Sequence, residues 1–343
     1  AGPDETQRGW DDPTVVLRLG ASPTSKRLRT YLAATDADQH VVDPTGRWRE
    51  AAFTATNLVV AEPSRLCARL SRLIGGGGGD PAWREQWLRA ERIATALHRG
   101  DPSSVTADAA VADVAADVPA DVHEGTVLRT VADAAPDPAT VFVSNSMPVR
   151  DLDRFVPPST TNLTALGNRG VSGIDGIVSS ALGAGSATTD DLTLVVGDLA
   201  LYHDSNGLLA VDRCAVDVTI VLINNDGGGI FHKLPVESFD PPFTDSFKTP
   251  HGLAFEPLST LYGLEYVRID AREAGSDTVG DTAADDDGTD DPSAALAAAY
   301  THAHETDGSH LIEVRTDAEA SQRIRERLLD AVERAVHGGD ESS

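Results

Sequence analysis

The sequence predicts an α/β fold whose main part is a doubly wound, mostly parallel sheet. Apolar, β-branched runs that are typical of buried strands alternate with amphipathic segments that are typical of helices. Two of these runs, 192–196 and 218–223, lead directly into Gly197-Asp198 and Asn224-Asn225. Parallel strands that are joined by crossover helices end at one edge of a sheet, where α/β proteins bind their ligands. We therefore expect ligand-binding side chains to gather at this edge.

A smaller α/β segment is predicted in the first third of the chain. Its expected strands and helices are strands 15–19, 40–42 and 57–60, helices 24–32 and 65–73, and a helix that begins at Asp80-Pro81. Aspartate is a good N-cap and proline is favoured at the first helical position. Five glycines, 75–79, interrupt the segment, and the Asp- and Ala-rich stretch 100–121 has the composition of a linker or a marginal helix. We place the domain boundary in this stretch and expect a partial central domain over residues 1–115.

The second α/β unit is expected over residues 120–340. Its elements are predicted as helices 122–134, 173–185 and 204–213, which precede the parallel strands 140–143, 192–196 and 218–223. A strand within 261–269, a helix at 293–303, a strand at 310–314 and an amphipathic helix ending near Gly338 follow. The segment 271–292 carries six aspartates between positions 281 and 291 and is expected to be a solvated acidic insertion.

The chain is strongly acidic, with a net charge of −26 over 343 residues. Lysine occurs only at positions 26, 233 and 248, and the remaining 25 of the 28 basic residues are arginine. This composition resembles that of proteins from salt-loving organisms, in which high salt screens the self-repulsion. An acidic protein of ordinary origin is the alternative. Such a surface argues against nucleic acid as a partner, because nucleic-acid binding needs clustered cations.

Several sequence features concern the environment of the protein. No apolar run approaches the ~18 residues of a membrane span, and no signal peptide opens the chain. We therefore expect a soluble, cytoplasmic protein with no membrane partner. Cys67 and Cys214 are isolated, which argues against a disulfide framework or a zinc site, and both are expected to be small core residues. Because Ala1 rather than Met opens the chain, we expect it to begin inside a larger protein.

Oxygen ligands for a metal ion are predicted at the edge of the main sheet. Mg²⁺ prefers hard oxygen ligands in octahedral geometry and retains substrate phosphates, so a few protein oxygens suffice. Asp198, Asn225 and the carbonyl of Gly227 supply one carboxylate, one carboxamide and one backbone oxygen after two neighbouring strands. The alternative for Asp198 is a helix cap, which is common where a strand leads into a helix.

Four motifs carry a family resemblance. They are Ser144-Asn145-Ser146, Asn168 to Gly176, Gly197-Asp198-Leu199 with Tyr202-His203-Asp204, and Asn224 to Phe231. The Gly-Asp and Asn-Asn pair is typical of thiamine-diphosphate enzymes in general, with Leu199 in place of the second glycine of their pattern. The four motifs in this order resemble the MenD family, the 2-succinyl-5-enolpyruvyl-6-hydroxy-3-cyclohexene-1-carboxylate synthases.

The resemblance implies a thiamine-diphosphate-binding fold, with thiamine diphosphate and Mg²⁺ or Mn²⁺ as cofactors. It implies a transferase of menaquinone biosynthesis that decarboxylates 2-oxoglutarate and adds the succinyl unit to isochorismate. It also implies a homodimer or homotetramer with sites between subunits. The glutamate that activates the cofactor would belong to an N-terminal pyrimidine-binding domain of a partner subunit. This domain is expected to be absent from the sequence, so we assign no catalytic residue and expect the chain alone to be incomplete.

Residue by residue, the resemblance implies that Asp198, Asn225 and Gly227 bind the metal. The cofactor would also contact Gly197 and Leu199, with Ile174 as an apolar wedge beneath it. The residues that would bind substrate are Lys26, Ser146, Arg150, Arg169, Ile230, Phe231 and Leu234. An arginine side chain suits the two dianionic substrates, because its guanidinium can donate two parallel hydrogen bonds to one carboxylate.

Simpler interpretations stay open for most of these residues. Ile174 fits the core face of helix 173–185, Arg169 could be a solvated cation, and Arg150 could form a surface ion pair with Asp151 or Asp153. Lys26 could belong to a basic helix start, and Ser146 could be an N-cap before Pro148. Two other functions are also open: another thiamine-diphosphate enzyme such as an acetolactate synthase, and a cofactor-binding subunit that is inactive alone.

Overall fold

The computed structural model describes residues 10–23, 25–50, 52–75, 79–101, 111, 114, 122–272 and 291–338. These residues form two compact units. The larger unit contains residues 95–101 and the described part of 114–331, and the smaller unit contains the other described residues. Glycines 76–78, most of the predicted linker 100–121 and residues 273–290 of the predicted acidic insertion lie outside the described residues.

The smaller unit contains a parallel sheet of three strands in the order β1-β2-β3. Its strands and helices are β1 (Val15–Leu19), α1 (Lys26–Ala34), β2 (Asp38–Val42), β3 (Asn57–Val59), α2 (Pro63–Ile74) and the greater part of α3 (Pro81–His98). The predicted start of α3 is confirmed, because the Asp80 carboxylate accepts a hydrogen bond from the backbone N–H of Ala82 at 2.8 Å. Every strand predicted here from the sequence overlaps an observed strand.

The larger unit contains a six-stranded sheet in the order β5-β4-β6-β7-β9-β8, and every pairing in it is parallel. The strands are β4 (Ala139–Val143), β5 (Leu163–Leu166), β6 (Asp191–Gly197), β7 (Thr219–Asn224), β8 (Glu265–Asp270) and β9 (His310–Arg315). The chain leaves β4 toward β5 on one side and returns to β6 on the other, which is the doubly wound pattern. The predicted fold class is thus confirmed.

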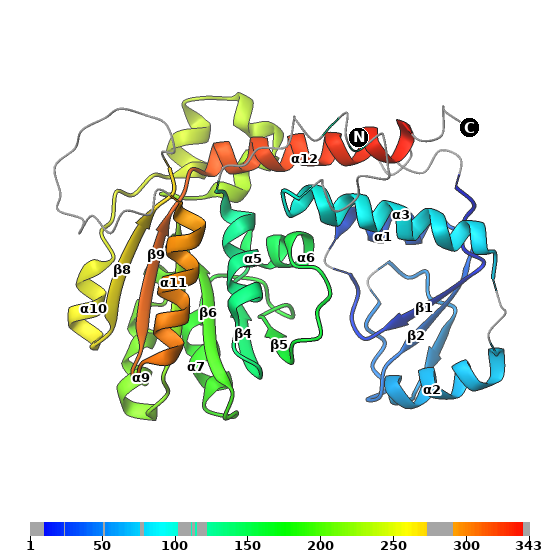
Figure 1. Cartoon of the computed structure of the whole chain (residues 1–343), viewed down its shortest axis with the longest axis horizontal. Coiled ribbons are helices and arrows are strands. Elements are labelled where there is room, and N and C mark those ends of the chain that lie inside the picture. The colour runs from blue at the N-terminus through cyan, green and yellow to red at the C-terminus, as the bar shows by residue number, and fades with distance from the viewer. Residues whose placement is uncertain are drawn as a thin grey trace. The chain divides into compact units, whose positions relative to one another are not determined.

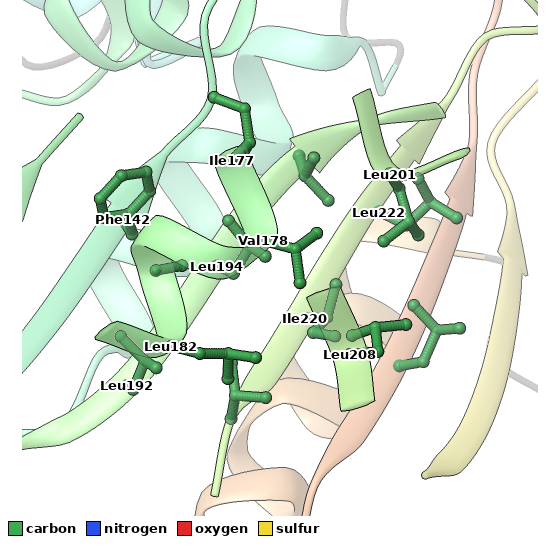
Figure 2. Close-up of a cluster of buried hydrophobic side chains, with 14 of the residues drawn as sticks. Phe142, Ile177, Val178, Leu182, Leu192, Leu194, Leu201, Leu208, Ile220 and Leu222 are labelled. Atoms are coloured by element: carbon green, nitrogen blue, oxygen red, sulfur yellow. The ribbon is translucent and has the colours of Figure 1, made fainter. Parts of the chain in front are cut away.

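Helices cover both faces of the six-stranded sheet (Figure 1). The helices that follow residue 122 are α5 (Glu124–Ala134), α6 (Pro148–Phe155), α7 (Ile177–Gly185), α8 (Asp198–His203), α9 (Leu209–Cys214), α10 (Glu256–Tyr262), α11 (Pro292–Glu305) and α12 (Ala318–Gly338). Alternate strand residues face opposite sides of the sheet. Leu194, Ile220 and Leu222 pack with Ile177 and Leu182 of α7, as Figure 2 shows.

The opposite face of the sheet packs against α5 and α11. Val195, Val221 and Ile312 are buried there with Leu128 of α5 and Tyr300 of α11. Each fully buried aliphatic side chain contributes about 1.5–3 kcal/mol relative to an exposed one. The two buried layers therefore fix the strand register, and with it the positions of the residues that follow β4, β6 and β7.

Two predicted helices begin elsewhere than expected. Helix α7 begins at Ile177, because Gly176 before it has a left-handed conformation (φ 67°), so Ile174 lies outside the helix. The predicted helix 204–213 is observed as a 3₁₀ turn at Ser205–Leu208 followed by α9, and α8 ends just before it. Asp204 separates α8 from this turn, and its carboxylate accepts a hydrogen bond from the backbone N–H of Ser179 at 3.0 Å. The sequence reading also missed α6, β5 and α10.

The prediction for the two cysteines is wrong, because both are exposed. Cys67 lies on α2, of which no residue is buried, and Cys214 is the last residue of α9.

Among the described helices, none combines the length and the apolar composition that crossing a membrane requires.

Candidate functional site

A cavity of about 440 Å³ lies at the carboxyl ends of β4, β6 and β7 in the larger unit. It brings together most of the residues that the sequence singled out. Those that line it are Ser146, Arg150, Arg169, Ile174, Gly197, Asp198, Leu199, Asn225, Gly227, Ile230 and Phe231. Leu234 is not among the lining residues and is 46% exposed. Lys26 is the first residue of α1 in the smaller unit. Roles for these two in substrate binding stay predictions.

Asp198 connects the end of β6 to the loop after β7. One carboxylate oxygen accepts hydrogen bonds from the backbone N–H groups of Asn225 (3.1 Å) and Gly227 (3.0 Å). The other accepts one from the backbone N–H of Leu199 at 2.6 Å. Burial raises the pKa of Asp198, and the hydrogen bonds from Gly227 and Leu199 and the nearby His251 oppose that rise. Asp198 therefore does more than start α8, because it holds two strand ends in one arrangement.

Asn225 presents an unpartnered oxygen. Its side-chain Nδ2 donates a hydrogen bond to Glu124 Oε1 at 2.5 Å. Its Oδ1 is buried and has no hydrogen-bond partner among the described residues. A buried polar atom without a partner is costly, so such an atom calls for an explanation. An oxygen of this kind beside a carboxylate fits a hard cation such as Mg²⁺.

The loop after β7 depends on its glycines. Gly227 has φ 137°, and a Cβ there would lie 2.1 Å from the backbone oxygen of Lys248. The N–H of Gly228 donates to the same oxygen at 2.7 Å. A Cβ on Gly229 would lie 2.6 Å from Asn225 Nδ2. The loop can therefore approach both the 247–248 backbone and the Asn225 amide only because these positions have no side chain.

The proposed ligand set contains a single acidic side chain. Clusters of three or more His, Cys, Asp or Glu side chains that could hold a metal ion do not occur among the described residues. One carboxylate, one amide oxygen and the carbonyl of Gly227 leave the other positions of an octahedral ion to water or phosphate. This is the chemistry of a metal ion that binds together with a phosphorylated ligand.

Two arginines supply positive charge to the cavity. Arg169 Nη1 donates to Asn145 Oδ1 at 2.6 Å, and Asn145 Nδ2 donates to the backbone oxygen of Gly173 at 2.7 Å. Arg150 Nη1 donates to the backbone oxygen of Ser146, whose φ is 71°. A positive φ is unfavourable for a serine and is often found at functional sites. Both guanidinium groups are thus anchored by the loops that line the cavity.

The structure decides some of the alternatives for these residues. The N-cap of α6 is Met147, so Ser146 does not cap that helix. Asp151, a candidate partner of Arg150, forms a hydrogen-bonded ion pair with Arg325 Nε at 2.9 Å. Arg169 is held by Asn145 rather than free in solvent. Ile174 lines the cavity from the loop before α7, where it is 37% exposed.

Two residues at this site were not predicted from the sequence. Glu124, at the start of α5, lines the cavity and contacts Asn225 across 101 positions of sequence. His251 Nε2 lies 3.2 Å from Asp198 Oδ2. No local pattern marks either residue, because each reaches the site only through packing of distant segments.

Together, the fold and the cavity define an α/β protein with candidate sites for a divalent metal and an anionic ligand at the carboxyl edge of a parallel sheet. Curated proteins named 2-succinyl-5-enolpyruvyl-6-hydroxy-3-cyclohexene-1-carboxylate synthase are similar to the chain over nearly all of its length. The protein of that name from Halorubrum lacusprofundi is 67% identical over 341 residues, which are 99% of the chain and 52% of the relative. The one from Haloquadratum walsbyi is 51% identical over 340 residues, covering 94% of the chain and 52% of the relative.

A more distant relative carries the same name. The protein from Roseiflexus castenholzii is 39% identical over 330 residues, covering 95% of the chain and 50% of the relative. The chain is therefore homologous to part of these synthases, which confirms the resemblance predicted from its sequence. It spans about half the length of the curated relatives it matches. No protein-family model matches the chain. The names of these relatives do not favour the acetolactate-synthase alternative.

Proposed function

We propose that the larger unit binds the diphosphate of thiamine diphosphate through a divalent cation, Mg²⁺ or Mn²⁺. Asp198, Asn225 and the carbonyl of Gly227 are the proposed protein ligands. The observation that carries this proposal is the buried Oδ1 of Asn225, which has no partner among the described residues, in a residue that lines the same cavity as Asp198. Gly197 and Leu199 line the cavity beside Asp198, where they would contact the cofactor.

We further propose that the whole protein carries out the reaction that its relatives' name describes, with 2-oxoglutarate and isochorismate as substrates. Thiamine diphosphate, when bound, supplies the electron sink that a 2-oxo acid needs for decarboxylation. The role of Arg150 and Arg169 would be to bind substrate carboxylates, together with Ser146, which precedes both in the chain and also lines the cavity. The apolar side chains of Ile174, Ile230 and Phe231 would exclude water from the reacting atoms.

The remaining proposals concern partners. We propose that the site is completed in a homo-oligomer, with the activating glutamate supplied by a pyrimidine-binding domain of a partner subunit. The residues of the larger unit support this proposal, because those proposed to bind a metal ion and anions lie in this unit. Glu124, the glutamate that lines the cavity, is already bonded to Asn225 and Arg325.

Calorimetric titration with thiamine diphosphate and Mg²⁺ tests the metal assignment. Asp198→Ala should abolish Mg²⁺-dependent binding while the far-ultraviolet circular dichroism remains that of the parent. Asp175→Ala is the matched control, because its side chain is 91% exposed and lies outside the cavity lining. It should bind like the parent. A folded Asp198→Ala variant with parent-like affinity would overturn the assignment.

A further inference from the structure

A buried ionic cluster lies directly behind Asn225. It consists of Glu124 at the start of α5, Asp151 on α6 and Arg325 on α12, and each of the three residues is 3% exposed or less. Glu124 Oε1 accepts the hydrogen bond from Asn225, and Glu124 Oε2 accepts one from Arg325 Nη2 at 2.5 Å. Arg325 also donates to both oxygens of Asp151, at 2.9 and 2.5 Å. The cluster thus forms a continuous chain of hydrogen bonds that ends at the amide of Asn225.

The charges within the cluster determine which group donates and which accepts in each of these hydrogen bonds. Burial lowers the pKa of Arg325, but Asp151 and Glu124 raise it further, so the guanidinium stays charged and its pKa lies above the ordinary value. Both oxygens of Glu124 accept hydrogen bonds, one from Asn225 and one from Arg325, as a carboxylate paired with a guanidinium does. Glu124 must therefore face the NH₂ group of Asn225, because the amide oxygen would be repelled. The amide can then have only one orientation, with Oδ1 on the side away from Glu124.

We propose that Glu124, held by Arg325 and Asp151, is a positioning residue that fixes the Asn225 amide with its oxygen toward the metal ion. The proposal rests on the proposed function, since it assumes that Asn225 Oδ1 is a metal ligand. Residues that orient metal ligands typically change metal affinity about 10- to 100-fold when they are replaced. A purely structural ion pair between α5, α6 and α12 would affect stability but leave the metal affinity of the folded protein unchanged.

Glu124→Gln tests the proposal with almost no change of shape. A glutamine offers one acceptor and one donor, whereas this site needs two acceptors. The charged hydrogen bond to Arg325 is the stronger of the two and takes the glutamine oxygen. The glutamine NH₂ group then faces Asn225, whose amide must turn its oxygen toward residue 124. We expect the affinity for Mn²⁺ in the presence of thiamine diphosphate to fall about 10- to 100-fold.

A compensating change provides a rescue experiment. In Asn225→Asp alone, two carboxylates face each other, and metal affinity should fall. In the double variant Glu124→Gln/Asn225→Asp, the glutamine NH₂ group donates to one aspartate oxygen and leaves the other for the metal. The double variant should bind Mn²⁺ at least about tenfold more tightly than either single variant. A merely structural role for Glu124 does not predict this recovery.

Glu313→Gln is the matched control. Glu313 is 3% exposed and accepts a hydrogen bond from the side chain of Asn224 at 2.7 Å, so it repeats the Glu124–Asn225 pair one position away. Its other oxygen accepts from the hydroxyl of Tyr266 at 2.5 Å. Because a hydroxyl can also accept, a glutamine at 313 satisfies both neighbours without turning Asn224. Its Mn²⁺ affinity should match that of the parent.

Electron paramagnetic resonance of Mn²⁺, titrated with the full chain and thiamine diphosphate, measures all five proteins. A parent that binds, two weakened single variants, a recovered double variant and a parent-like Glu313→Gln are the expected results. If the parent binds but folded Glu124→Gln binds equally well, or if the double variant does not recover, the positioning role is wrong and the proposed function stands. If the parent itself does not bind Mn²⁺ with thiamine diphosphate, both the proposed function and this inference are contradicted.

Discussion

Acid should destabilise the larger unit through two histidines near the start of α5, of which His123 is buried and His98 is partly buried. His98 and His123 flank the ring of Phe155, with ring centroids 5.1 and 4.9 Å away. His123 Nδ1 caps α5 by accepting a hydrogen bond from the N–H of Gly125 at 3.0 Å, and it cannot do so when protonated. Burial lowers the pKa of His98 to about 4 and that of His123 to about 3.

The direction and size of the effect follow from proton linkage. The histidines of the unfolded chain titrate near pH 6.5, so between pH 6.5 and about 4 the unfolded chain binds more protons than the folded protein. The free energy of unfolding is unaffected by these residues above that range and falls as the pH drops through it. At about pH 5, each histidine should lower it by roughly 1.5 pH units times 1.36 kcal/mol, or about 2 kcal/mol.

Denaturant unfolding at constant ionic strength, measured at pH 8 and pH 5, checks this expectation. His123→Asn keeps a side chain that can cap α5 but does not titrate. It should reduce the stability lost between the two pH values by about 2 kcal/mol. His98→Asn should remove a similar share, and the double variant should remove both. A parent-like loss in the double variant would show that these histidines are not held neutral in the folded protein.

Two further predictions concern the cavity. In the complete enzyme, Arg169→Ala should lose on the order of 1.5–3 kcal/mol of charged hydrogen bonding. The loss should appear as a lower kcat/KM with little change in cofactor affinity. Normal kinetics for both 2-oxoglutarate and isochorismate would make Arg169 a structural residue. Gly227→Ala should weaken cofactor binding measured by calorimetry, because its Cβ would lie 2.1 Å from the backbone oxygen of Lys248. The control is Gly263→Ala, whose Cβ would meet nothing within 4 Å and which should leave cofactor binding unchanged.

Sequence reasoning located the parts of the site that follow strands. Asp198 and Asn225 come directly after β6 and β7, and parallel pairing of these strands brings both residues into one cavity. Strand positions were predictable because the apolar runs are buried on both faces of the sheet. The same apolar pattern that marks these strands in the sequence also buries them in the sheet, so it fixes where the residues after them lie.

Other parts of the site depend on contacts that no local pattern encodes. Glu124 and Arg325 are 201 positions apart, and their ion pair forms only where the start of α5 packs against α12. The start of α7 was misplaced because a left-handed Gly176 delays the helix, which moves Ile174 into the cavity-lining loop. At the start of the next predicted helix, the side chain of Asp204 bonds to Ser179, and a 3₁₀ turn precedes α9.

A crystal structure of the chain with thiamine diphosphate and Mn²⁺ would show the proposed metal site itself, because anomalous scattering locates the metal. We expect a Mn²⁺ peak in the cavity, coordinated by Asp198, by the carbonyl of Gly227 and by Asn225 Oδ1, with Asn225 Nδ2 still bonded to Glu124. A metal peak elsewhere, or an Asn225 amide that turns its nitrogen toward the ion, would contradict it.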